Sequence, residues 1–138
     1  MTTLVATDSR LANLAVTERY AEAWRTGDRV VMADCYHDAF TLHYFGDNPF
    51  AGDHIGKDTA LATLAKLSRH TNRRLLGIVD VMAGPNRATI IAREQFERDG
   101  RTAELERILV YAIRDGKLHE CWVYDADRAL VDSLLAGA

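Results

Sequence analysis

The stretch that decides the fold is RATIIAREQFERDGRTAELERILVYAIRDGKLHECWVYD, residues 87–125. It contains three runs typical of β-strands, separated by Asp99-Gly100 and Asp115-Gly116, which are typical of tight hairpin turns. Residues 75–83 form a fourth such run and are followed by a Gly-Pro-Asn turn. Four runs joined by short turns predict an antiparallel meander, with strands longer than the usual length of about five or six residues.

Before the meander, apolar side chains recur mostly at the spacing of a helix. We expect three helices and one strand there, and an amphipathic tail at the end of the chain: a helix from Asp8 or Ser9 to Ala23, helices over 29–39 and 57–70, a strand over 40–45 and a tail over 127–138. Gly27 is expected to end the first helix and Asp28 to cap the second.

Helices followed by a long antiparallel meander are typical of the α+β class, in which helices cover one face of a curved sheet. Long strands that face helices often curl. We therefore expect a curved antiparallel sheet wrapped around the N-terminal helices, forming a cone with an internal pocket. The chain has 138 residues, no internal repeat and no linker-like segment, which indicates a single domain over residues 1–138.

Composition and charge exclude several classes of protein. The net charge is −3 and the basic residues are scattered, with Arg73-Arg74 as the only adjacent pair, so no nucleic-acid partner is expected. The start of the chain lacks the pattern of a signal peptide, and no apolar run approaches the ~20 residues of a membrane span. We expect a cytoplasmic protein with no membrane partner.

No motif for a metal or an organic cofactor is present. The five histidines show neither HxH nor HExxH spacing, and CxxC, glycine-rich nucleotide loops and GxSxG are absent. Cys35 and Cys121 lie far apart within apolar runs, which favours two buried free thiols over a disulfide. We therefore expect a protein that works without metal or cofactor.

The pairing of the strands predicts which side chains face inward, because side chains alternate along a strand. A two-residue turn at Asp99-Gly100 places two sets on one face: Ile90, Ala92, Glu94 and Phe96 with Ala103, Leu105 and Arg107. A three-residue turn before Lys117 sets the next pairs: Ile113 with Lys117, Tyr111 with His119, Leu109 with Cys121, and Arg107 with Val123. The polar groups on the inward face are then Glu94, Arg107, Tyr111, His119 and Asp125, and a slip of one residue would reverse them all.

Four segments resemble the nuclear transport factor 2-like superfamily, and within it the SnoaL-like branch: RYAEAWRTGD (19–28), CYHDAFTLHYF (35–45), NPFAGDHIGKD (48–58) and RDGKLHECWVYD (114–125). The resemblance covers nearly the whole chain. It implies a conical pocket between the concave face of the sheet and the helices, often in a homodimer. The superfamily includes isomerases, epoxide hydrolases, polyketide cyclases, dehydratases and non-catalytic binders, so the fold leaves the function open.

Resemblance to ketosteroid isomerase implies one catalytic residue. Tyr20, seven residues before Gly27, matches the tyrosine that donates to the developing oxyanion of that enzyme. The alternative is a tyrosine that only packs in the core. Tyr44 stands where the isomerase has its aspartate base, and Leu109 where it has a protonated acid. Isomerisation by that mechanism is therefore not expected.

Resemblance to the epoxide hydrolases of this fold, which use an Asp-Arg-Asp arrangement, implies a second catalytic group. Arg107 corresponds to their arginine, but Leu109 replaces the neighbouring aspartate. Asp125 is the remaining acid, and Glu94 can substitute for the missing one. The alternative is that Glu94 and Arg107 form a buried ion pair that shapes the floor of the cavity.

His119 and Asp125 are the acid/base candidates for a SnoaL-like cyclase or a related lyase, which moves a proton beside a carbonyl in an apolar pocket. The alternatives are an exposed histidine on a strand, and a cap of the tail helix by Asp125 or Asp127. The candidates for substrate contact are His43, Tyr44, Phe45, Phe50, Glu94, Leu109 and Tyr111. His43 faces outward in a regular strand and inward if a bulge ends that strand.

The resemblance also implies that the loop between His43 and Asp58 lies at the pocket mouth, with Phe45, Phe50 and His54 at the entrance. Trp122 has the outward parity, and an apolar outer face suits a homodimer interface.

The leading hypothesis is a cofactor-independent acid/base enzyme (cyclase, isomerase, lyase or hydrolase) that acts on a small apolar substrate through Tyr20, Arg107, His119 and Asp125. The alternatives are a non-catalytic ligand-binding domain and a pure dimerisation module.

Overall fold

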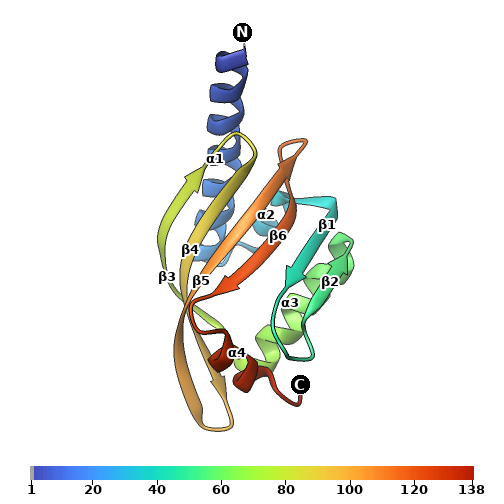
Figure 1. Cartoon of the computed structure of the whole chain (residues 1–138), viewed down its shortest axis with the longest axis vertical. Helices are drawn as coiled ribbons and strands as arrows, with labels where there is room; N and C mark the ends of the chain where they lie inside the picture. Colours follow the sequence, from blue (N-terminus) through green and yellow to red (C-terminus); the bar gives the residue numbers. More distant parts are fainter. Residues whose placement is uncertain (1) are drawn as a thin grey trace.

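One mixed sheet organises the structure, a computed structural model that describes the backbone of residues 2–138 and the side chains from Ser9 onward. Within that range six strands lie in the order β2-β1-β6-β5-β4-β3 (Figure 1). Their bounds are β1 Tyr36–Tyr44, β2 Gly52–Ile55, β3 Arg74–Ala83, β4 Arg87–Arg98, β5 Arg101–Arg114 and β6 Lys117–Asp125. Neighbouring strands pair antiparallel except β1 and β6, which pair in parallel.

The helices lie mainly on one face of this sheet. Their bounds are α1 Thr2–Thr26, α2 Arg29–Cys35, α3 Lys57–Thr71 and α4 Arg128–Leu135. Figure 1 shows α1, α2 and α3 behind the curved sheet and α4, in dark red, near one end of it. The edge strands β2 and β3 do not pair with each other, so the sheet is curved but not closed. The predicted α+β fold is confirmed.

Several predicted helix bounds were wrong, including the end of the first helix, which lies at Thr26 rather than at Ala23. The first helix begins at Thr2, so Asp8 and Ser9 lie inside it and neither is its cap; the side chain of Asp8 is outside the described range. Asp28 caps α2 as predicted, its carboxylate accepting a hydrogen bond from the Val31 amide at 3.1 Å. That helix ends at Cys35 rather than at residue 39, because the chain from residue 36 pairs with β6.

The strand β2 was not predicted at all. It is short and mostly exposed, and its Gly-Asp start carries little strand propensity. It exists because Gly52–Ile55 pairs with residues 41–44 of β1. Tertiary pairing, rather than local preference, makes this segment a strand.

Both Asp-Gly dipeptides form two-residue turns with positive φ at each position, as type I′ turns require. The prediction for Asp99-Gly100 is confirmed, since Arg98 pairs with Arg101 and the expected inward sets of β4 and β5 share one face.

The three-residue turn predicted before Lys117 was wrong, because Arg114 rather than Ile113 pairs with Lys117. A bulge then follows. Residue 113 pairs with Leu118 and residue 112 pairs with Glu120, which leaves His119 as the extra residue. Beyond the bulge Tyr111 lies opposite Cys121, Leu109 opposite Val123, and Arg107 opposite Asp125. Of the four pairs predicted from the longer turn, the pair of Ile113 is therefore corrected by one position and the other three by two.

The core fills the space between the concave face of the sheet and the helices. Its fully buried apolar side chains include Phe40, Leu42, Leu67, Ile90, Phe96, Leu118, Val131, Leu134 and Leu135. Burying each such side chain stabilises the fold by about 1.5–3 kcal/mol relative to exposure. Both cysteines are buried free thiols, as predicted. Over the described residues no helix is long and apolar enough to cross a membrane.

Candidate functional site

Two adjoining spaces lie between the helices and the concave face. The larger, which we call the mouth cleft, has a volume of about 920 Å³ and is lined by the end of α1, by α2 and α3, and by residues 73–75 and 94. The smaller, the inner chamber, is lined by inward side chains of β1, β5 and β6 and has a volume of only about 20 Å³. That is room for about one water molecule. Five residues line both spaces: Tyr20, Trp24, Tyr36, Leu64 and Arg73.

Four side chains of alternating charge form a chain beside these spaces: Arg73, Glu94, Arg107 and Asp125. The first three line one or both spaces, and Asp125 lies behind Arg107. Arg107 lies on β5 directly opposite Asp125 of β6, and Glu94 of β4 lies diagonal to it. The Arg107 guanidinium donates from Nε to Oδ1 of Asp125 at 2.6 Å and from Nη2 to Oδ2 at 3.3 Å. Its Nη1 donates to Oε2 of Glu94 at 3.3 Å, and the other oxygen of Glu94 accepts from Arg73.

This chain is buried and balanced, with two cations and two carboxylates. The side chain of Glu94 is fully buried, and those of Arg107 and Asp125 are 2% and 4% exposed. Burial lowers the pKa of Arg107, but Tyr44, Glu94 and Asp125 outweigh it, so its pKa lies above its ordinary value. Every oxygen of the two carboxylates accepts a hydrogen bond from an arginine. Neither carboxylate is therefore a free base in this state.

Tyr20 of α1 and Tyr36 of β1 meet where the two spaces adjoin. Their hydroxyl oxygens are 2.5 Å apart, and the two rings pack edge to face. Burial raises the pKa of Tyr20 to about 12, against a smaller lowering by its hydrogen bond to Tyr36. Burial likewise raises the pKa of Tyr36 well above its ordinary value. Both phenols are therefore neutral at pH 7.

This pair has a spare donor. Two hydroxyls carry two protons, and the bond between them uses one. Among the side chains from Ser9 onward, neither Tyr20 nor Tyr36 makes a second hydrogen bond. One O–H can therefore point into the adjoining spaces and donate to an acceptor there.

Three predicted substrate-contact residues line the inner chamber: Tyr44, Leu109 and Tyr111. The Tyr44 hydroxyl accepts from Arg107 at 2.5 Å. Burial raises the pKa of Tyr111 well above its ordinary value. Glu94, a further predicted contact, lines the mouth cleft. Tyr20 and Arg107, two of the predicted catalytic residues, also line the inner chamber, so both side chains face the interior.

His119 does not join this group. As the extra residue of the bulge, it lies outside the lining of both spaces, with its ring 5.0 Å from that of His37. The predicted inward position of His119 was therefore wrong. Asp125 does converge with Arg107, but as a paired carboxylate. Asp127, not Asp125, caps α4 by accepting from the Leu130 amide at 3.0 Å.

His43 faces away from both spaces, as a regular strand predicts. Its ring lies between two carboxylates on the outer face, with Nδ1 2.7 Å from Asp53 and Nε2 2.9 Å from Glu120, and it stacks on Trp122. Burial lowers the pKa of His43, but the two carboxylates outweigh this and raise it above its ordinary value. The inward alternative for His43 is thereby excluded.

The loop after β1 also lies away from the mouth cleft. Phe45 packs on Tyr124 of the outer face, with ring centroids 5.3 Å apart. Phe50 is buried and lies near His70 of α3. The His54 ring donates to the Phe50 carbonyl at 2.7 Å. None of these three lines either space, so the prediction of an entrance built by this loop was wrong.

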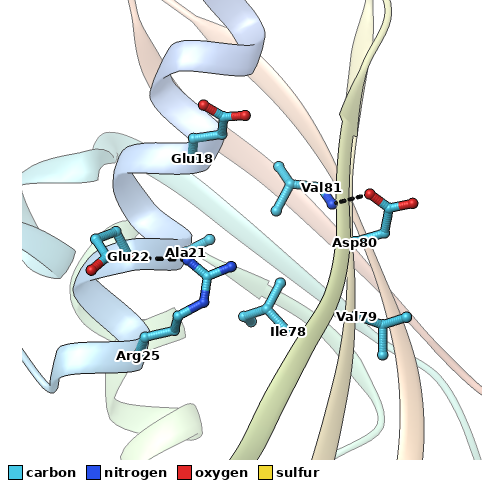
Figure 2. A pocket seen from close by; sticks show the side chains of 8 residues that line it. All are labelled: Glu18, Ala21, Glu22, Arg25, Ile78, Val79, Asp80 and Val81. Atoms are coloured by element: carbon cyan, nitrogen blue, oxygen red, sulfur yellow. Dashed lines mark hydrogen bonds and ion pairs between the residues drawn. The ribbon is translucent and has the colours of Figure 1, made fainter.

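A second surface groove of about 460 Å³ lies between α1 and the edge strand β3 (Figure 2). Its charged side chains are exposed: Glu18, Glu22, Arg25 and Asp80. Arg25 pairs with Glu22 at 2.9 Å, and Asp80 accepts from the Val81 amide. No buried polar side chain lines this groove, so we place the candidate site at the mouth cleft and inner chamber. Among the side chains from Ser9 onward, no three metal-ligating groups lie close enough together to hold a metal ion.

Several site residues were missed by sequence reasoning. Tyr36 was assigned to a helix, and a helix ending at Cys35 would have given it the inward parity of Phe40 and Leu42. Arg73 was noted only as half of a basic pair. Its position between α3 and β3, where it meets Glu94 and lies 5.5 Å from the ring of Trp24, has no local signal.

The model of a SnoaL-like domain matches residues 17–121. No match was found among curated proteins. Three solved structures are similar to this chain in fold, each at less than 20% sequence identity. Bal32a from a soil-derived mobile gene cassette has a TM-score of 0.82 and 19% identity, covering 92% of this chain and 98% of its own.

TerC, co-crystallised with polyporic acid, has a TM-score of 0.74 and 16% identity, covering 89% of this chain and 98% of its own. A candidate SnoaL-like polyketide cyclase from Jannaschia sp. CCS1 has a TM-score of 0.72 and 13% identity, covering 94% of each chain. The family match spans most of the chain, residues 17–121 of 138. The chain belongs to the SnoaL-like domain family, which includes polyketide cyclases and isomerases.

Proposed function

We propose that this domain binds a small, largely apolar molecule in the mouth cleft and holds a carbonyl or phenol oxygen of that molecule at the Tyr20–Tyr36 pair. The observation that carries the proposal is the spare O–H of two buried, neutral phenols where the cleft meets the inner chamber. An oxygen acceptor that reaches this point gives the hydroxyl the partner it lacks.

The cleft suits such a molecule in size and lining. Its volume of about 920 Å³ lies within the usual range of ligand sites, about 300–1,000 Å³. The apolar part of the lining comes from Trp24, Met32, Leu61, Leu64 and Leu75. Support also comes from TerC, a protein of the same fold that was co-crystallised with polyporic acid.

Binding is favoured over acid/base catalysis because of the state of the two carboxylates. A donor pair like Tyr20–Tyr36 can stabilise an oxyanion. Proton abstraction beside a carbonyl also needs a base, and Glu94 and Asp125 are both occupied by arginines. His119, the third candidate, lies outside both spaces.

The test uses two ligands that differ only in the oxygen. 2-Acetylnaphthalene and 2-ethylnaphthalene compete with the fluorescent probe N-phenyl-1-naphthylamine for the wild type and for Y20F/Y36F. The double variant is used because either hydroxyl alone can still donate. We expect the ketone to bind about two- to tenfold more weakly to Y20F/Y36F, the usual worth of one hydrogen bond, and the hydrocarbon to bind unchanged.

Y124F is the matched control, because the Tyr124 ring is exposed on the outer face and leaves both affinities unchanged. Equal loss of both ligands in Y20F/Y36F, or no loss of either, contradicts the proposal.

A water-activating hydrolase is the second candidate, because two carboxylates flank Arg107, and Arg107 itself lines the inner chamber, which has room for about one water. In that reaction the water oxygen bonds to one epoxide carbon while its proton passes to a carboxylate. The C–O bond opens, and the alkoxide takes a proton from a neighbouring donor. Binding alone predicts no diol from styrene oxide. The hydrolase would instead be established if the wild type forms the diol and D125N does not, provided that D125N keeps the near-ultraviolet circular dichroism of the wild type.

A further inference from the structure

The mouth cleft is strongly basic, although the whole chain carries a net charge of −3. Five arginines line it: Arg25, Arg29, Arg69, Arg73 and Arg74. The only carboxylate in its lining is Glu94, which Arg73 and Arg107 already neutralise. The charge of the cleft is therefore opposite in sign to the charge of the molecule.

Three of these arginines are uncompensated within the described part of the chain. Arg25 pairs with Glu22, and Arg73 pairs with Glu94. Arg29, Arg69 and Arg74 are exposed and make no ion pair or side-chain hydrogen bond with any residue from Ser9 onward. They come from three elements, namely the start of α2, the last turn of α3 and the start of β3.

Helix electrostatics explain only one of these positions. A cation in the last turn of a helix is stabilised by the helix dipole, which accounts for Arg69. Arg29 is the first residue of α2, where the same dipole is unfavourable for a cation. Arg74 begins a strand and has no such effect. Clefts lined by charge of one sign attract ligands of the other sign, and arginine binds carboxylate and phosphate oxygens through paired donors.

We propose that the ligand of this cleft is an anionic amphiphile. Its apolar body lies against Trp24, Leu61 and Leu64, and its carboxylate or phosphate group lies at the mouth among Arg29, Arg69 and Arg74. This inference rests on the proposed binding function and adds the charge of the ligand to it. The carbonyl or phenol oxygen at the Tyr20–Tyr36 pair is then the inner end of the molecule, and the anion is its outer end.

The experiment compares two probes with one skeleton. 8-Anilinonaphthalene-1-sulfonate carries a sulfonate that N-phenyl-1-naphthylamine lacks, so their affinity ratio measures the contribution of the anion. We expect the sulfonate to bind wild type at least tenfold more tightly at low ionic strength. In R29Q/R69Q/R74Q we expect about a tenfold loss for the sulfonate and less than a twofold change for the neutral probe. Added salt should weaken the binding of the sulfonate probe and leave the binding of the neutral probe unchanged.

R10Q/R114Q/R128Q is the matched control, because it removes the same charge at exposed arginines outside the cleft. It leaves the ratio unchanged. Near-ultraviolet circular dichroism shows that each variant is folded, since the sulfonate probe also binds loosened proteins. Displacement by 2-naphthoate or by 2-naphthyl phosphate then assigns the head group as carboxylate or phosphate.

The outcomes separate the two proposals. A65W fills the cleft at an exposed residue of its lining, and it blocks both probes if they bind there. One outcome would contradict only the anionic ligand: the neutral probe binds, A65W blocks its binding, and the sulfonate probe binds no more tightly than the neutral one. The proposed binding site would then remain supported. A ratio unchanged by the triple variant has the same consequence. If neither probe binds, or if A65W blocks neither, both proposals fail.

Discussion

Arg107 in the inner chamber and Arg69 at the mouth cleft are the same side chain in opposite settings. Arg107 is almost fully buried, and Glu94, Asp125 and Tyr44 meet its guanidinium. Arg69 is exposed and has no partner among the described residues. A buried charge must be compensated by the protein itself. A charge at a cleft is compensated by water, and a ligand can replace that water.

The two regions therefore serve different purposes. Polar groups of the chamber satisfy one another, so their first effect is on the shape and stability of the cone. Polar groups of the cleft are left open, so their first effect is on what binds. The Tyr20–Tyr36 pair lies between the regions and is satisfied only in part. Substitutions in the inner chamber should therefore change mainly the free energy of unfolding, and substitutions in the mouth cleft should change mainly ligand affinity.

The largest expected effect comes from breaking the buried chain at its centre. R107M leaves the carboxylates of Glu94 and Asp125 buried without Arg107, and we expect it to lower the free energy of unfolding by about 3–5 kcal/mol. R69M, the matched change at the mouth, should alter it by less than about 0.5 kcal/mol. Urea unfolding of both variants provides the measurement. Equal losses would show that burial does not distinguish the two arginines.

A third region, the outer face of the sheet, exposes apolar rather than charged side chains to solvent. Three of these side chains are exposed on adjacent elements: Phe45 just after β1, Tyr124 on β6 and Ile108 on β5. We retain the prediction of a homodimer through this face, and expect I108E/Y124E to weaken self-association by about 2 kcal/mol or more, at least about thirtyfold. Light scattering across micromolar concentrations measures it. A wild-type protein that is monomeric at these concentrations would contradict the prediction.

The fold was predictable because its signals are local. Asp-Gly turns, strand runs and apolar helix faces each act over a few residues, and together they specify an α+β meander. The same locality explains the failure at β2, a short polar segment that becomes a strand only by pairing with β1. It also explains the start of β1, where pairing with β6 overrides a helical pattern.

The site was predictable only as far as parity reached. Glu94 and Arg107 follow from one two-residue turn, and their ion pair was among the expected alternatives. The bulge beside Leu118 has no sequence signal, yet it removes His119 from the interior. The convergence of Arg29, Arg69 and Arg74 depends on how α2, α3 and β3 meet, which no spacing along the chain encodes.

A smaller effect is expected at His43, which is intermediate between the buried and the open charges. Carboxylates only accept hydrogen bonds, so both ring nitrogens donate only when the imidazole is protonated. Its folded pKa is raised, so its stabilisation is fully present below the unfolded pKa of about 6.5 and is lost as pH rises through the folded pKa.

NMR titration of the His43 ring should give a pKa above 6.5 in wild type, and a lower one in D53N/E120Q. We expect the free energy of unfolding of wild type to lose about 1 kcal/mol relative to H43F across that interval, the scale of one hydrogen bond. A His43 pKa at or below the ordinary value would remove the bridging role.

The smallest effect on stability should come from the residues with the largest expected effect on anion binding. In R29Q/R69Q/R74Q, no partner among the described residues loses a bond, because these arginines have none. Mutual repulsion is also relieved. We expect the free energy of unfolding to stay within about 0.5 kcal/mol of wild type at moderate salt, and to rise slightly at low salt, where repulsion is least screened. Urea unfolding at two ionic strengths tests this. A loss of several kcal/mol would mean that these arginines are held by the fold itself, and the contrast between chamber and mouth would disappear.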